Sequence, residues 1–117
     1  GDVERLDRLP GAERRTIFAR MTAESGLALW QTLSWWHDPF MATSVNPNHI
    51  KAPALVIAGG RDAIHPPVTV RQTAERLRAR FVTMHDMSHW LPGEPGWEDV
   101  AQTCLTWIAE ATARTAA

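Results

Sequence analysis

Two short apolar runs with a helix-like segment between them are the clearest pattern in the second half of the chain. Residues 55–57, Leu-Val-Ile, are β-prone and are closed by two glycines, as in a buried strand that ends in a tight turn. A second run of this kind covers residues 81–85. The segment over residues 67–80 follows a proline, which suits the first turn of a helix. Its apolar residues recur at helical spacing: Val70, Ala74 and Leu77.

Strand, helix and strand in this order predict a βαβ unit with parallel strands and a right-handed crossover. Both strands then end at the same edge of the sheet, where open α/β sheets bind their ligands. Asp62 follows the first strand and His89 follows the second. We therefore expect these two side chains to lie side by side. Asp62 alone also fits a plain turn residue that bonds only to its own backbone.

The apolar positions of the first 49 residues predict helices and no strand. We expect one helix from about residue 12 and a second over residues 23–36, followed by an irregular link over 41–52. A last helix is expected over residues 97–113. Its expected buried stripe comprises Val100, Cys104, Trp107, Ile108 and Ala111. Only two strands are convincing, whereas a sheet normally has about four to six, so we expect a further polypeptide or segment to complete the sheet.

These motifs resemble the C-terminal part of the α/β-hydrolase fold family. The resemblance rests on residues 50–67, Ile-Lys-Ala-Pro-Ala-Leu-Val-Ile-Ala-Gly-Gly-Arg-Asp-Ala-Ile-His-Pro-Pro, and on Met87-Ser-His-Trp. It implies an α/β fold in which residues 50–117 form the C-terminal portion of a parallel hydrolase sheet (β-α-β-α). Residues 1–49 would be a helical, cap-like segment before it. The resemblance also implies that Asp62 is the acid and His89 the histidine of a catalytic triad.

The nucleophile elbow of that family, G-x-S-x-G on a strand-to-helix turn, is absent from this sequence. Ser25 lies in Thr-Ala-Glu-Ser-Gly, which lacks the first glycine and any preceding strand. We therefore expect a heterodimer, in which a second polypeptide carries the elbow and the remaining strands. The resemblance implies hydrolysis of small hydrophobic ester-like substrates (esters, thioesters, lactones) through a serine acyl-enzyme. Relatives with an aspartate nucleophile cleave epoxides or carbon–halogen bonds, and nothing in these residues distinguishes the two.

Asp62 and His89 have the chemistry of a carboxylate and the base that it orients. The carboxylate fixes the imidazole tautomer, and the other ring nitrogen accepts a proton from the nucleophile. Imidazole suits this role because its ordinary pKa of about 6.5 lies near working pH.

Aromatic residues are the candidates for substrate binding, because ligand pockets are commonly lined by aromatic side chains. The candidates are Trp35, Trp36, Phe40 and Trp90. The first three also fit core packing between two helices, or contacts with a partner chain, where aromatic residues are enriched. These alternatives stay open on the sequence alone.

Composition narrows the function classes. The formal net charge is −1 over 117 residues, which gives no electrostatic footprint for nucleic acid. The four other histidines do not follow metal-ligand spacing, so we expect no metal and no cofactor. They are His37, His49, His65 and His85. Gly59-Gly60 does not match the dinucleotide-binding motif.

The sequence also bears on the cellular location and on an alternative function. No apolar run approaches the length of a membrane span and no signal peptide is visible, so we expect no membrane partner and a cytoplasmic location. The alternative to a hydrolase subunit is a non-catalytic remnant or partner-binding module with the same fold. The presence of both Asp62 and His89 favours the hydrolase subunit, since a remnant needs neither.

Overall fold

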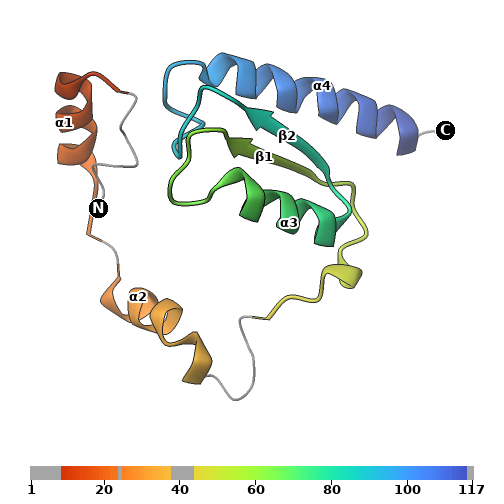
Figure 1. Cartoon of the computed structure of the whole chain (residues 1–117), viewed down its shortest axis with the longest axis horizontal. Helices are drawn as coiled ribbons and strands as arrows, with labels where there is room; N and C mark the ends of the chain where they lie inside the picture. Colours follow the sequence, from red (N-terminus) through yellow and green to blue (C-terminus); the bar gives the residue numbers. More distant parts are fainter. Residues whose placement is uncertain (1–8, 24, 38–43, 116–117) are drawn as a thin grey trace.

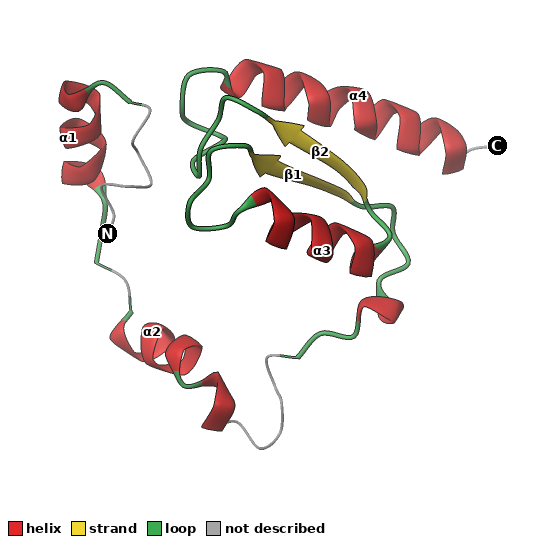
Figure 2. Cartoon of the chain, in the orientation of Figure 1, coloured by secondary structure: helices red, strands yellow, loops and turns green. Residues whose placement is uncertain are grey.

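The computed structural model describes residues 9–23, 25–37 and 44–115 of the chain (Figure 1). Within these ranges the structure is a mixed α/β arrangement (Figure 2). The helices are α1 (Gly11–Arg20), α2 (Gly26–Leu33), α3 (Pro67–Leu77) and α4 (Trp97–Thr115), and the strands are β1 (Leu55–Gly59) and β2 (Arg80–Met84). Single 3₁₀ turns occur at Trp35–His37 and Pro47–His49.

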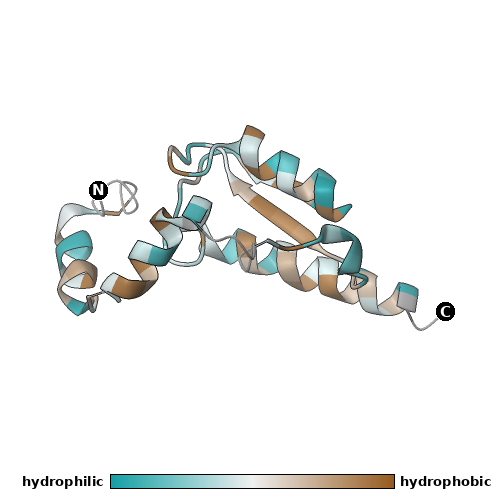
Figure 3. Cartoon of the chain, turned by 90° about the horizontal axis from the view of Figure 1, so that it is seen from below, coloured by the Kyte–Doolittle hydropathy of each residue, from teal (hydrophilic) through white to brown (hydrophobic). Residues whose placement is uncertain are grey.

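The predicted βαβ unit is confirmed. β1 and β2 pair in parallel, with Leu55 opposite Arg80 and Gly59 opposite Met84. α3 connects them, and Figures 1 and 3 show α3 and α4 on opposite sides of the two strands. Both strands therefore end at one edge, and the loops that follow them lie there together (Figure 2).

α3 is shorter than the sequence pattern suggested. Its predicted core position Ala74 is buried, with 1% of its surface exposed. The helix ends at Leu77 because Arg78 adopts a left-handed conformation, with φ of 53°, a common way to close a helix. Arg80 already belongs to β2, where its guanidinium bonds to Glu110 of α4 at 2.6 Å.

The second predicted helix is also shorter than expected. It begins at Gly26, because the side chain of Ser25 accepts a bond from the backbone N–H of Ala28 at 3.3 Å and thereby caps the helix. It ends at Leu33 and continues only as a 3₁₀ turn. Neither α1 nor α2 buries a residue. In the described part of the chain, the apolar residues of these two helices therefore do not form a packed core between them.

The expected buried stripe of α4 is right except at one position. Val100, Cys104 and Trp107 are half-buried and Ala111 is buried, but Ile108 is 51% exposed. At 100° per residue, Ile108 lies beside Leu105 and Trp97, which are exposed as well. The apolar arc of α4 is thus wider than the surface that the strands and loops cover.

Much apolar surface is left uncovered across the chain. Its accessible surface is 9009 Å², against about 6,400 Å² for a folded monomer of this mass. The radius of gyration is 17.0 Å, against about 13 Å for a compact domain of this length. Figure 1 shows the reason, since α1 and α2 form an arm apart from the β-α-β-α unit. Among the described residues, no helix combines the length and apolarity that a bilayer span requires.

Candidate catalytic pair

The two loops that follow the strands are held together by backbone hydrogen bonds. The N–H of Gly60 donates to the carbonyl of Met84 at 2.8 Å, and the N–H of Arg61 donates to that of Met87 at 2.9 Å. These bonds extend the pairing of β1 and β2 past the ends of both strands. They bring the segment that precedes Asp62 against the segment that precedes His89.

Two glycines allow this close approach. A Cβ atom on Gly59 would lie 2.0 Å from the carbonyl oxygen of Ser88, and one on Gly60 would lie 2.4 Å from that of His85. Both neighbours are backbone atoms, which cannot swing aside as a long side chain can. The Gly-Gly pair is therefore required by the contact between the loops, in addition to any role in the turn.

Asp62 divides its hydrogen bonds between its two carboxylate oxygens. Oδ1 accepts from the backbone N–H groups of Ile64 at 2.8 Å and His65 at 2.9 Å. Oδ2 accepts from Nδ1 of His89 at 3.0 Å. The turn role and the pairing role that the sequence left as alternatives are thus both present, on different oxygens. The side chain of Asp62 is only 8% exposed.

The electrostatic balance at Asp62 favours the carboxylate. Burial on its own raises the pKa of Asp62, but the N–H of His65, the ring of His89 and the N–H of Ile64 together outweigh burial. The net effect lowers the pKa of Asp62 below its ordinary value. An ionised Asp62 at neutral pH is an acceptor only, so Nδ1 of His89 is the donor of this bond, and in the neutral ring this tautomer places the lone pair on Nε2.

His89 lies at the surface of this edge, with 27% of its side chain exposed. The ring of His65 meets it edge-on, with centroids 5.2 Å apart and planes at 89°. Within the described residues Nε2 of His89 has no hydrogen-bond partner. The base nitrogen is thus accessible, while the ring orientation is fixed by Asp62 on one side and limited by His65 on another.

The structure describes the side chains of two of the predicted aromatic residues, Trp36 and Trp90, and does not bring these two together around the pair. Trp36 lies in the 3₁₀ turn after α2 and is 62% exposed, in the arm that Figure 1 shows apart from the strands. Trp90 is next to His89 but packs within its own loop, since a Cβ on Gly93 would lie 2.6 Å from the Trp90 ring. The side chain of Trp35 and the whole of Phe40 lie outside the described residues.

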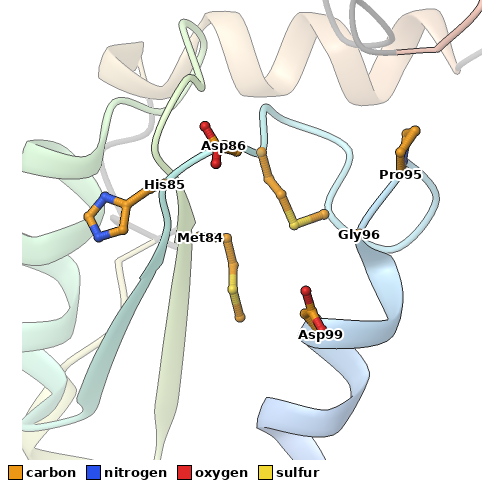
Figure 4. Close-up of a pocket in the computed structure, with 7 residues that line it drawn as sticks. Met84, His85, Asp86, Pro95, Gly96 and Asp99 are labelled. Atoms are coloured by element: carbon orange, nitrogen blue, oxygen red, sulfur yellow. The ribbon is translucent and has the colours of Figure 1, made fainter.

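A pocket of about 440 Å³ lies between the loop after β2 and the start of α4 (Figure 4). It is lined by Met84, His85, Asp86, Met87, Pro95, Gly96 and Asp99. In Figure 4 the ring of His85 points away from Asp99. Neither member of the Asp62–His89 pair lines this pocket, so it flanks the pair and does not contain it.

The sequence pattern did not point to Glu94 as a functional residue. Glu94 and Ser88 are each only 2% exposed. Oε1 of Glu94 accepts from the N–H of Ser88 at 2.7 Å, and Oε2 accepts from its hydroxyl at 3.0 Å. The one available signal was a single acidic residue between Gly93 and Pro95, five positions after the histidine.

Comparison with known proteins gives no assignment. No protein-family model, curated protein or solved structure matches the chain. Among the described residues, no group of three or more potential metal ligands is brought together. The functional interpretation therefore depends on the geometry of the Asp62–His89 pair.

Proposed function

We propose that this chain supplies the acid and the histidine of a serine-hydrolase triad that cleaves small hydrophobic ester-like substrates. The observation that carries the proposal is the 3.0 Å bond between Oδ2 of Asp62 and Nδ1 of His89. It lies at the carboxyl edge of a parallel βαβ unit, the edge at which α/β sheets bind ligands. The carboxylate is nearly buried and the ring is partly open, as an orienting acid and a working base require.

The chemistry follows from the protonation of the pair. With Asp62 ionised and Nδ1 protonated, Nε2 of His89 takes the proton from a nucleophilic hydroxyl as the hydroxyl attacks the ester carbonyl. The resulting imidazolium is stabilised by the Asp62 carboxylate and then protonates the leaving alkoxide. A water molecule, deprotonated in the same way, then attacks the acyl-enzyme and releases the acid, and the imidazolium returns its proton to the departing serine oxygen. Each step uses Asp62 only to orient and to stabilise charge.

The hydroxyl comes from a second polypeptide. Ser88 is adjacent to His89 but is buried, and its hydroxyl donates to Glu94. Ser25 is occupied in capping α2. The second polypeptide would carry the serine on a strand-to-helix elbow, together with the groups that stabilise the oxyanion.

The open edge of β1 is where we place the strands of that polypeptide. The bonds from Arg80 to Ala54 and from Gly60 to Met84 face β2. In a parallel ladder, bonds alternate between the two sides of a strand, so the backbone groups of Leu55 and Ile57 face away from β2. The half-buried run over 55–57 is apolar on both faces, as in parallel strands that are covered on both sides.

The exposed apolar residues support the same partner. Leu105 and Ile108 on α4, and the uncovered residues of α2, give it surfaces to bury. Specific stable interfaces bury about 1,200–2,000 Å² in total, and obligate ones more. This chain exposes 9009 Å² against about 6,400 Å² for a compact monomer, an excess of about 2,600 Å² that exceeds a standard interface and is of the size that obligate interfaces bury.

The alternative function is a partner-binding module without catalysis, which the exposed apolar helices also favour. Hydrolysis separates the two. The experiment is steady-state hydrolysis of p-nitrophenyl butyrate by the chain isolated with its associated polypeptide. His89→Ala should abolish nearly all turnover, while the two polypeptides remain associated. His85→Ala, a change at an exposed histidine four residues away, should leave turnover intact. Near-normal turnover of His89→Ala, or hydrolysis by this chain alone, would overturn the proposal.

A further inference from the structure

Glu94 is the largest side chain that is fully buried in the described part of the chain. A buried carboxylate is costly unless hydrogen bonds satisfy it. Both of its oxygens bond to Ser88, one through the backbone N–H and one through the hydroxyl. The carboxylate thus binds Ser88, the residue that immediately precedes His89.

The backbone of Glu94 is fixed as well. Its N–H donates to the carbonyl of Trp90 at 3.1 Å, and its carbonyl accepts from the N–H of Trp97 at 3.1 Å. Trp97 is the first residue of α4. Glu94 therefore connects the start of α4 with residues on both sides of His89, Ser88 before it and Trp90 after it.

The segment before His89 also contacts the end of β1. The carbonyl oxygen of Ser88 lies so close to Gly59 that a Cβ there would be 2.0 Å away. Ser88 is thus held by Glu94 through its N–H and hydroxyl, and lies against β1 through its carbonyl. These contacts restrict the backbone next to His89. Nδ1 of the His89 ring lies 3.0 Å from Oδ2 of Asp62.

We infer that Glu94 is a positioning residue, which acts through Ser88 to hold His89 within hydrogen-bonding reach of Asp62. Without the carboxylate, Ser88 loses two hydrogen bonds to Glu94, and the loss of hydrogen bonds in a buried loop favours a different loop conformation. A displacement of about 1 Å at a catalytic group can cost on the order of 10²-fold in rate. The catalytic consequence rests on the proposed function, whereas the positioning of the ring does not.

The test is the tautomer of His89, measured by ¹⁵N NMR on histidine-labelled chain isolated with its associated polypeptide. In the wild type, His89 should be protonated on Nδ1, with that proton slow to exchange. Glu94→Ala should lose this proton signal and shift the ring toward the Nε2-protonated form that is usual for free histidine. Glu94→Gln keeps an oxygen for the N–H of Ser88 and should largely restore the wild-type signal. Glu98→Ala, at an exposed glutamate in the first turn of α4, is the matched control and should change nothing.

Kinetics give the second measurement. Glu94→Ala should lower kcat for ester hydrolysis about 10²-fold with little change in KM, and Glu94→Gln should recover most of the loss. A wild-type tautomer in Glu94→Ala overturns the inference. If Glu94→Ala fails to assemble, Ser88→Ala decides, because it removes the hydroxyl bond to Glu94; an unchanged tautomer in Ser88→Ala then overturns the inference. A wild type that hydrolyses no ester, with a tautomer that still depends on Glu94, refutes the proposed function and leaves the positioning intact.

Discussion

Replacement of Asp62 by asparagine separates the proposed catalytic role of the carboxylate from its role in the turn. The asparagine side chain retains an oxygen at the Oδ1 position for the N–H groups of Ile64 and His65, so the local turn should persist. The change falls on Oδ2, where an amide NH₂ replaces the acceptor for His89. The ring must then accept at Nδ1, which places the proton on Nε2 and removes the free base.

The expected magnitudes differ sharply between stability and rate. A hydrogen bond to a charged group contributes about 1.5–3 kcal/mol and a neutral one about 1 kcal/mol, so the asparagine variant should lose only about 1 kcal/mol. Asp62→Ala should lose more, because it also leaves the part-buried N–H of Ile64 without its acceptor. In a Ser-His-Asp protease the corresponding asparagine substitution lowers kcat about 10⁴-fold through the wrong tautomer, and a loss of that order is expected here.

The lowered pKa of Asp62 adds a dependence on pH. Its folded pKa lies below the unfolded value, which is about 3.9. The ionised carboxylate therefore stabilises the fold above that pH, and the contribution is lost as the pH falls through the folded pKa. Asp62→Asn should flatten the fall in stability in this acidic range.

The assay combines ester hydrolysis by the assembled protein at neutral pH with urea unfolding between about pH 3 and pH 7, a range that starts below the ordinary aspartate pKa. Near-normal turnover of Asp62→Asn would refute the tautomer reasoning. An asparagine variant less stable than the alanine variant would refute the division of roles between the two oxygens.

Four other substitutions test the packing and the exposed surfaces. Gly59→Ala should destabilise the protein by driving a methyl group into the carbonyl of Ser88, whereas Gly26→Ala, which meets nothing within 4 Å, should not lower the melting temperature. Leu105→Asp should weaken association with the second polypeptide, measured by sedimentation, because this 62% exposed residue belongs to the uncovered face of α4; unchanged association would count against that face. Trp36→Ala should lower the melting temperature little, since its side chain is 62% exposed; a large drop in melting temperature would indicate core packing instead.

The topology and the juxtaposition of Asp62 and His89 were predictable because both depend on local patterns. Two apolar runs with a helix between them dictate parallel strands, and parallel strands bring residues that follow them, such as Asp62 and His89, to one edge. Glu94 was not predictable in this way, because its burial depends on how the loop closes over Ser88. The exposure of Ile108 was also not predictable, since an apolar position in a helix does not show whether this chain or another one covers it.

The proposed function requires His89 to activate a serine that lies outside these 117 residues. Labelling of the assembled protein with a fluorophosphonate probe, followed by peptide mapping, identifies that serine directly. We expect one labelled serine on the associated polypeptide, and loss of that label in His89→Ala but not in His85→Ala. A label on a serine of this chain, or a label that persists in His89→Ala, would show that His89 does not have this role.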